Sequence, residues 1–193
     1  LPQTMGNEFV GIIEKIGPKV TNFKIGDRIF ARNPVNNIGA FAQKIVINEK
    51  AVGKAPEYLS DQEAAAVPLT TLTAMQAFQL LNLKAGQTLF ISGGSGSFGA
   101  MAIPLAIAQG YKVITTGNET SRARLEKLGV EKFLNYKTED YTKAVANVDA
   151  VIDTIGGEET VKQLSILKDG GEIVLLKGMP NREFAKKMNM GLA

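Results

Sequence analysis

Short apolar runs rich in β-branched residues recur along most of the chain, and helix-forming sequence separates them. The runs predict five strands, at residues 88–92, 112–116, 132–136, 150–154 and 172–176. Residues 100–109 and 121–128 predict helices between the first three strands, and Gly110 and Gly129 follow these helices as left-handed caps. Apolar strands that alternate with helices are typical of the α/β class, so the pattern predicts a doubly wound parallel sheet.

The first part of the chain has a different pattern, in which short β segments alternate with turns. Residues 9–16, 28–31 and 41–47 predict strands, with turn-forming glycine, proline and asparagine combinations between them. We therefore expect a small, incomplete β unit at residues 1–66 and the alternating unit at residues 67–193.

Helix signals mark the junction of the two units. Ser60 and Glu63 fit a capping box, which predicts a helix that continues through residues 64–66 until Pro68 interrupts it. A second helix is predicted over residues 74–83, before a glycine-containing stop.

A glycine-rich loop stands between the predicted strand at residues 88–92 and the helix at residues 100–109. Its glycines, Gly94, Gly96 and Gly99, have the spacing of a dinucleotide-binding loop. In such a loop the first glycine permits the turn, the second permits close approach of a pyrophosphate, and the third permits the helix to pack on its strand. A tight turn of a parallel sheet without a ligand is the alternative.

The end of the next strand bears on which dinucleotide binds. NAD-preferring domains place an acid about 20 residues beyond the loop, on the ribose hydroxyls. Asn118 occupies that place, 19 residues after Gly99, and Arg122 and Arg124 follow it. A neutral amide does not repel a 2′-phosphate and a guanidinium can bind one, which favours NADP(H) over NAD(H). Against this, Glu119 is adjacent, and both arginines have a plain interpretation as solvated helix surface.

The loops after the last two predicted strands are candidates for the nicotinamide side. Thr154 and the pair Gly156 and Gly157 follow one strand, and Gly178 follows the other. Ligands of doubly wound sheets lie beyond the carboxyl ends of the strands, where these loops fall. Ordinary turn formation explains each single glycine equally well.

The composition removes whole classes of chemistry. The 193 residues include no cysteine and no histidine, which excludes thiolate nucleophiles, disulfides and zinc sites of the usual nitrogen and sulfur ligands. We therefore expect no metal. The formal net charge is +3 from scattered Lys and Arg, so nucleic acid is not indicated. No apolar run approaches the roughly 20 residues that span a membrane, and we expect a cytoplasmic protein.

Several separate motifs resemble the medium-chain dehydrogenase/reductase superfamily, in its zinc-independent quinone oxidoreductase branch. Residues 6–11, 24–29 and 39–42 are similar to motifs of its GroES-like catalytic domain, and residues 64–74 to the crossing into its NAD(P)-binding Rossmann domain. Zinc-dependent alcohol dehydrogenases of the superfamily carry histidine where this chain has Asn7. The resemblance covers nearly the whole chain. Because the chain starts with Leu1 and ends within a helix predicted at residues 182–193, we expect both ends of a longer protein to be absent.

The resemblance implies NADPH-linked reduction of a small-molecule quinone or a conjugated enone or enal, in a protein that is a homodimer when full length. It implies roles for the following residues: Ser95, Gly96, Ser97 and Phe98 on the pyrophosphate, Asn118 and Arg122 on the adenosine phosphate, Tyr136 beside the adenine, and Thr73 near the nicotinamide ribose. Gly99, which the loop spacing assigns to helix packing, counts with them as part of the cofactor site. It implies no histidine acid, because solvent protonates the enolate or quinol oxyanion. The catalytic residues that face the substrate stay unassigned.

Two other functions stay open. A doubly wound methyltransferase also binds an adenosyl group over a glycine loop, although it too favours an acid where Asn118 stands. A catalytically silent nucleotide-sensing or RNA-binding protein could keep the same fold. The sequence pI near 9.0 favours this second alternative, and the absence of clustered aromatic and basic residues disfavours it.

Overall fold

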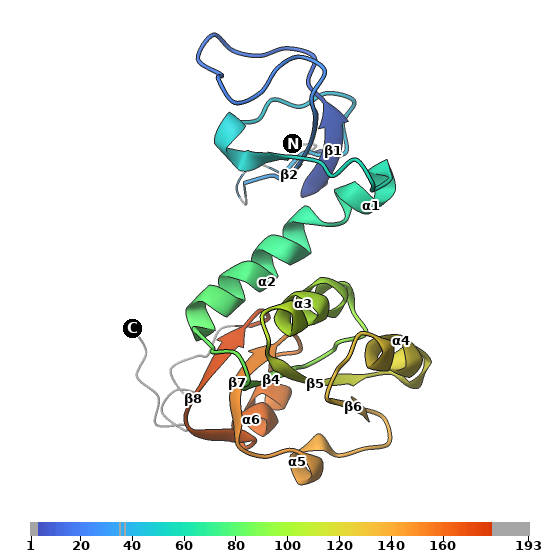
Figure 1. Ribbon diagram of the computed structural model, residues 1–193, viewed down its shortest axis with the longest axis vertical. Helices are drawn as coiled ribbons and strands as arrows, with labels where there is room; N and C mark the ends of the chain where they lie inside the picture. Colours follow the sequence, from blue (N-terminus) through green and yellow to red (C-terminus); the bar gives the residue numbers. More distant parts are fainter. Residues whose placement is uncertain (1–3, 35, 37, 179–193) are drawn as a thin grey trace. The chain divides into compact units, whose positions relative to one another are not determined.

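The computed structural model describes residues 4–34, 36 and 38–178, and the chain forms two compact units, Leu1–Thr73 and Ala74–Ala193 (Figure 1). The first unit contains a three-stranded antiparallel sheet with the order β1-β2-β3. Its strands are β1 (Glu8–Ile12), β2 (Arg28–Arg32) and β3 (Val52–Lys54). The strand predicted at residues 28–31 is confirmed, and the one predicted at 9–16 is shorter than expected.

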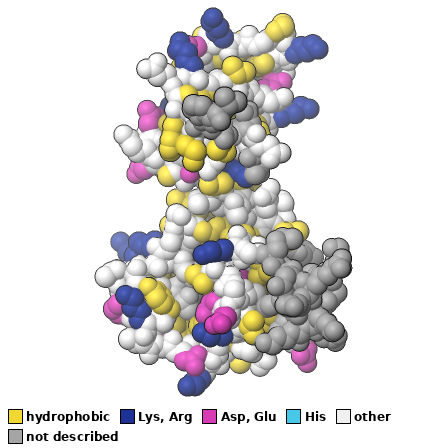
Figure 2. Space-filling view, turned by 180° about the vertical axis from the view of Figure 1, so that it is seen from behind, with side chains coloured by type: hydrophobic (Ala, Val, Ile, Leu, Met, Phe, Trp, Pro, Cys, Tyr) yellow, Lys and Arg dark blue, Asp and Glu magenta, His cyan; other side chains and the backbone are white. Residues whose placement is uncertain are grey.

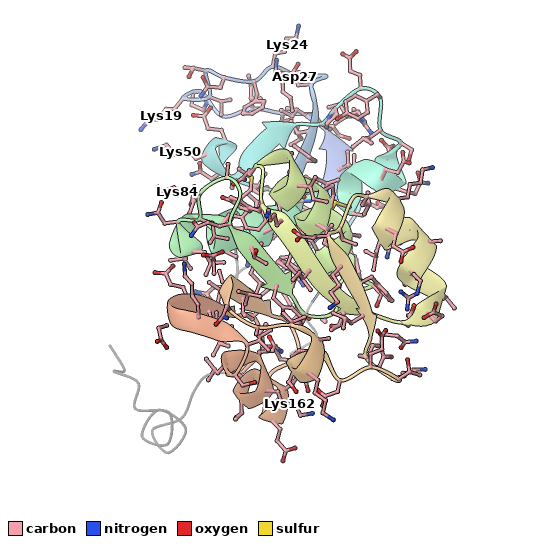
Figure 3. All side chains as sticks on the ribbon, turned by 60° about the horizontal axis from the view of Figure 1, so that its bottom comes forward. Lys19, Lys24, Asp27, Lys50, Lys84 and Lys162 are labelled. Atoms are coloured by element: carbon pink, nitrogen blue, oxygen red, sulfur yellow. The ribbon has the colours of Figure 1, made fainter. Side chains whose placement is uncertain are left out.

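A tight turn and one arginine organise this sheet. The backbone N–H of Lys24 donates to the Asp27 carboxylate over 3.0 Å, which closes the turn before β2 (Figure 3). Arg28 then donates to the Asp61 carboxylate and to the carbonyl oxygens of Pro56 and Leu59, over 2.7–3.0 Å. A single guanidinium therefore holds the start of β2 to the segment that leads into the first α-helix.

The strand predicted at residues 41–47 is wrong. This segment forms bends and irregular backbone up to the short 3-10 helix η1 (Glu49–Ala51). The first residue of the segment makes its hydrogen bond outside the sheet, because the backbone N–H of Phe41 donates to the Met5 carbonyl oxygen. Val46 is 96% exposed. An alternating apolar pattern becomes a strand only where a neighbouring strand accepts its hydrogen bonds, and the described residues provide none here.

The junction holds two helices, α1 (Asp61–Ala65) and α2 (Pro68–Leu81). The capping box of Ser60 and Glu63 is confirmed. Pro68 does end the first helix, but it also begins the second, which starts six residues before the prediction. Proline is tolerated at the first helical position because its missing N–H would be unpaired there. The Glu8 carboxylate accepts from the backbone N–H of Leu69 over 2.8 Å and so caps α2 from β1.

Replacing Ser60 with alanine is expected to lower the free energy of unfolding by about 1 kcal/mol, the usual cost of losing an N-cap. The Ser60 hydroxyl accepts from the backbone N–H of Glu63, and the Ser60 amide and hydroxyl hold the pKa of Glu63 below its ordinary value. Urea unfolding measures the loss. Thr138→Ala is the control, because Thr138 is exposed and its hydroxyl makes no hydrogen bond with the described residues. Equal midpoints for the two variants would contradict the cap.

The second unit is built on a five-stranded parallel sheet with the order β6-β5-β4-β7-β8. Its strands are β4 (Thr88–Ile91), β5 (Lys112–Gly117), β6 (Lys132–Asn135), β7 (Val148–Asp153) and β8 (Leu167–Leu175). All five predicted strands are confirmed, although the last two begin earlier than predicted. The doubly wound parallel sheet is therefore confirmed.

Helices cover both faces of this sheet, with α3 and α4 on one face and α5 and α6 on the other (Figure 1). They are α3 (Ser97–Ala108), α4 (Arg122–Lys127), α5 (Tyr141–Ala144) and α6 (Glu158–Leu164), with the 3-10 helix η2 (Glu119–Ser121) before α4. Leu89 and Ile91 of β4 pack in the cluster under α3 and α4, whereas Phe90 packs in the opposite cluster. Two buried faces explain why the strand is apolar at successive positions.

The left-handed caps are confirmed, since φ is 81° at Gly110 and 92° at Gly129. The helix predicted at residues 182–193 lies outside the described residues.

In the part of the chain that the structure describes, no helix is both long and apolar enough to cross a membrane, and no three metal-ligating side chains come together. On the face shown in Figure 2, cationic and anionic side chains are interspersed.

Candidate functional site

The candidate residues of the second unit lie on loops at the carboxyl ends of its parallel strands. Chain order reverses at β4, because β5 lies on one side of it and β7 on the other. Such a reversal opens a crevice beyond the strand ends, which is where doubly wound sheets bind ligands. The glycine loop that follows β4 occupies this point.

The turn of the glycine loop is made by Gly93, which has a φ of +70°. The expected turn residue, Gly94, does not have a positive φ. Gly94 instead allows close packing, since a Cβ there would overlap Oγ1 of Thr115. Thr116 of β5 anchors the loop, because its hydroxyl accepts from the Gly93 N–H over 3.1 Å and its carbonyl oxygen accepts from the Gly94 N–H over 2.8 Å.

Helix α3 packs directly on this loop. A Cβ on Gly99 would overlap the backbone of Gly94, so the first turn of α3 approaches the loop as closely as two glycines permit. Both glycines are buried, whereas Gly96 and Ser97 at the tip are exposed. The loop is therefore a compact cradle with an open tip.

Backbone N–H groups at the start of α3 are available to a ligand. The Gly96 N–H donates to the Gly93 carbonyl oxygen, and the Ala100 N–H donates to the Gly96 carbonyl oxygen, each over 3.0 Å. The N–H groups of Ser97, Phe98 and Gly99 have no acceptor among the described residues. Three unpaired donors at the positive end of a 12-residue helix fit a phosphate group.

Asn118 begins the loop after β5 and serves as a cap. Its Oδ1 accepts from the backbone N–H and the hydroxyl of Ser121 and from the hydroxyl of Thr120, over 2.7–3.0 Å. The side chain is therefore a neutral amide fixed at the strand end. Tyr136 lies beside this loop, because its backbone N–H donates to the Gly117 carbonyl oxygen. The residue is 57% exposed.

The arginine predicted for the adenosine phosphate, Arg122, is engaged by carboxylates. Its guanidinium donates two hydrogen bonds to Glu119, over 2.7 and 3.1 Å, and it lies 3.5 Å from Glu126 and from Glu139. It also stacks on the Phe133 ring at 4.5 Å. The hydrogen bond and charge of Arg122 hold the pKa of Glu119 below its ordinary value, so Glu119 is an ionised but paired carboxylate.

Asp153 at the end of β7 is the buried centre of the next loop. Its carboxylate accepts from the backbone N–H groups of Ile155 and Gly156, over 2.8 and 3.1 Å, and from the side chains of Thr160 and Gln163. It is fully buried. Burial raises the pKa of Asp153, but these hydrogen bonds outweigh burial and hold it below its ordinary value.

The loops after β4, β7 and β8 are joined. Thr154 donates through its backbone N–H to the Ser92 hydroxyl and through its own hydroxyl to the Ser92 carbonyl oxygen, each over 2.9 Å. Gly156 has a φ of +78°, and a Cβ there would lie 2.6 Å from the Lys177 carbonyl oxygen. Thr154 and Gly156 therefore lie between the glycine loop and the loop that carries Gly178, an exposed residue with a φ of +80°.

Thr73 lies in the first unit, where its hydroxyl donates to the Leu69 carbonyl oxygen within α2. Its place near a nicotinamide ribose stays a prediction.

Sequence reasoning missed Gly93, Ser92 and Asp153. A signal was present for Asp153, because it is a carboxylate that ends an otherwise apolar strand and precedes Thr-Ile-Gly-Gly. A polar residue at that position has to be satisfied by the loop that follows it.

Two family models match the chain. Residues 1–57 match the alcohol dehydrogenase GroES-like domain, and residues 98–191 match the family described as zinc-binding dehydrogenase.

Relatives and solved structures agree with these models. The chain is 30% identical to the 2-methylene-furan-3-one reductase of Solanum lycopersicum, and the match covers 98% of the chain and 53% of that protein. It is also 30% identical to the quinone oxidoreductase of Mus musculus, with 91% of the chain and 56% of that protein covered. The quinone oxidoreductase structure from Coxiella burnetii superposes with a TM-score of 0.90 at 33% identity, covering 98% of this chain and 62% of the other. The chain thus spans about half the length of the curated relatives it matches.

Proposed function

We propose that this chain, which belongs to the medium-chain dehydrogenase/reductase superfamily, carries the NADPH site of a reductase that passes a hydride to a quinone or to a conjugated enone or enal without zinc. The coarser function, an oxidoreductase of this superfamily, follows from the relatives. The observation that carries the dinucleotide site is the cradle after β4, with its unpaired N–H groups at Ser97, Phe98 and Gly99.

The described residues fit a dinucleotide from end to end of the second unit. Residues 95–99 would hold the pyrophosphate, because their backbone is open at the tip and donates toward it. Tyr136 offers an exposed ring to the adenine. Thr154, Gly156 and Gly178 would line the nicotinamide side, with backbone that approaches closely because two of the three lack side chains.

Two features support NADPH over NADH. Asn118 is neutral where NAD-binding domains carry an acid, and its Oδ1 is already used by three donors. Glu119, the neighbouring acid, is paired with Arg122, so ribose hydroxyls would compete with a guanidinium for it. A 2′-phosphate would meet less repulsion here than beside an unpaired carboxylate.

The bound nicotinamide would supply the hydride, and the residues of the chain would hold the nicotinamide in position. Residues at the loop tips would fix the two ends of the dinucleotide, which would restrict the reacting geometry. The composition supports a reaction without zinc, since the sequence contains no cysteine or histidine ligand. The substrate class is proposed from the relatives, which are named for a furanone and for quinones.

Titration with NADPH and with NADH, followed by nicotinamide fluorescence, tests the cofactor. We expect NADPH to bind at least about tenfold more tightly, the effect of one added charge-assisted hydrogen bond. Oxidation of NADPH by a quinone and by an enal, each with and without a chelator, then tests the reaction, and we expect the rate to be unchanged by the chelator. If the protein binds neither NADPH nor NADH, the proposal is wrong.

A further inference from the structure

Helix α4 carries two arginines that differ in their surroundings. Arg122 is directed at carboxylates on three sides, from Glu119, Glu126 and Glu139. Its side chain is 35% exposed and its guanidinium lies against the Phe133 ring. A cation that is already paired and stacked would have to give up these contacts before it could bind a phosphate.

Arg124, the second arginine of α4, contacts the glycine loop instead of carboxylates. Its guanidinium donates to the Ser95 carbonyl oxygen in the glycine loop over 3.4 Å, and the residue is exposed. It makes no ion pair with any residue that the structure describes. A guanidinium has five N–H donors, so this one contact leaves most of them directed at solvent.

The position of Arg124 connects two parts of the site. It extends from α4, which follows the β5 loop and Asn118, to Ser95, which precedes the unpaired N–H groups of α3. A ribose joined to a pyrophosphate on α3 would lie between these two loops. The side chain therefore places a planar cation where the adenosine ribose would be.

We propose that Arg124, rather than Arg122, binds the 2′-phosphate of the adenosine ribose and sets the preference for NADPH. Arg122 has an indirect role: it neutralises Glu119, which would otherwise repel the phosphate. This inference rests on the proposed function, because it takes the cofactor to be NADPH.

The test uses three variants of the otherwise intact protein, and two of them decide the assignment. Arg124→Gln removes the charge that we assign to the phosphate, and the double variant Glu119→Gln with Arg122→Gln removes the ion pair while keeping the net charge. Dissociation constants are measured for NADPH and NADH by nicotinamide fluorescence, and for adenosine 2′,5′-bisphosphate and AMP by competition.

Arg124→Gln is expected to weaken NADPH and adenosine 2′,5′-bisphosphate about tenfold or more and to change NADH and AMP less than about threefold. The double variant is expected to keep the NADPH preference. Arg124→Lys retains a point charge without the planar fork and is expected to fall between wild type and Arg124→Gln.

Two results would overturn the assignment: a preference that survives Arg124→Gln, or a preference that is lost in the double variant. If the preference survives because Arg124→Gln weakens NADPH and NADH equally, Arg124 only holds the glycine loop through Ser95. Failure of the proposed function looks different, because wild type would then bind neither nucleotide or would prefer NADH.

Discussion

Replacing Gly99 with alanine is expected to lower the free energy of unfolding by about 3 kcal/mol, at the upper end of the usual cost of overpacking, and to abolish dinucleotide binding. The added Cβ would overlap the backbone of Gly94, which has no flexible side chain that could move aside. Helix α3 has to shift away from the loop, and the N–H groups of Ser97, Phe98 and Gly99 shift with it. Urea unfolding and NADPH titration measure the two effects.

Two other glycines separate the effects of space and of function. Gly17→Ala is the control for space, since nothing lies within 4 Å of a Cβ there. Gly96→Ala meets only the Gly93 carbonyl oxygen, at 3.3 Å, and is expected to cost less than about 1 kcal/mol. Its exposed Cβ is nevertheless expected to weaken NADPH, because it stands at the open tip of the cradle. The packing argument fails if Gly99→Ala is as stable as Gly17→Ala.

Replacing Asp153 with alanine is expected to cost about 3 kcal/mol or more of unfolding free energy, because four donors, two of them buried, lose a charged acceptor. The N–H groups of Ile155 and Gly156 and the side chains of Thr160 and Gln163 would be left without it. The loop that carries Thr154 and Gly156 should open as a result, so NADPH binding should weaken even where the protein stays folded. Chemical unfolding and titration of the folded variant check both effects, and Asp169→Ala, an exposed carboxylate, is the control.

The same carboxylate predicts a pH dependence. Since the pKa of Asp153 is held below its ordinary value in the fold, the unfolded chain takes up a proton first as pH falls. The stabilisation is therefore present above the ordinary carboxylate pKa of about 4 and is lost as pH falls below it. Asp153→Asn should flatten this acid dependence of the unfolding free energy. An unchanged slope would show that other carboxylates account for it, of which Asp149, with a pKa also held low, is the next to test.

Most of the second unit could be predicted because its determinants are local. Strands buried on both faces need continuous apolar runs, so each of β4 to β8 can be predicted from its own segment. Helices that end in a left-handed residue favour glycine there, so the caps at Gly110 and Gly129 can be predicted in the same way. The prediction at residues 41–47 failed because a strand also needs a partner, which no local pattern specifies. Pro68 was interpreted only as a helix breaker for the same reason, since its role depends on the residues that precede and follow it.

The sequence by itself determined the doubly wound sheet, the glycine loop after β4, the neutral residue at the end of β5 and the exclusion of cysteine and histidine chemistry. Only the tertiary structure decided which residues cooperate. Thr154 and Ser92 are 62 positions apart, Arg124 and Ser95 are 29 apart, and Arg122 reaches Glu139 across the next strand. Hydrogen bonds and ion pairs form between atoms that are close in space. The sheet brings the ends of its strands together, and the sequence around any one residue does not specify which distant residues become its neighbours.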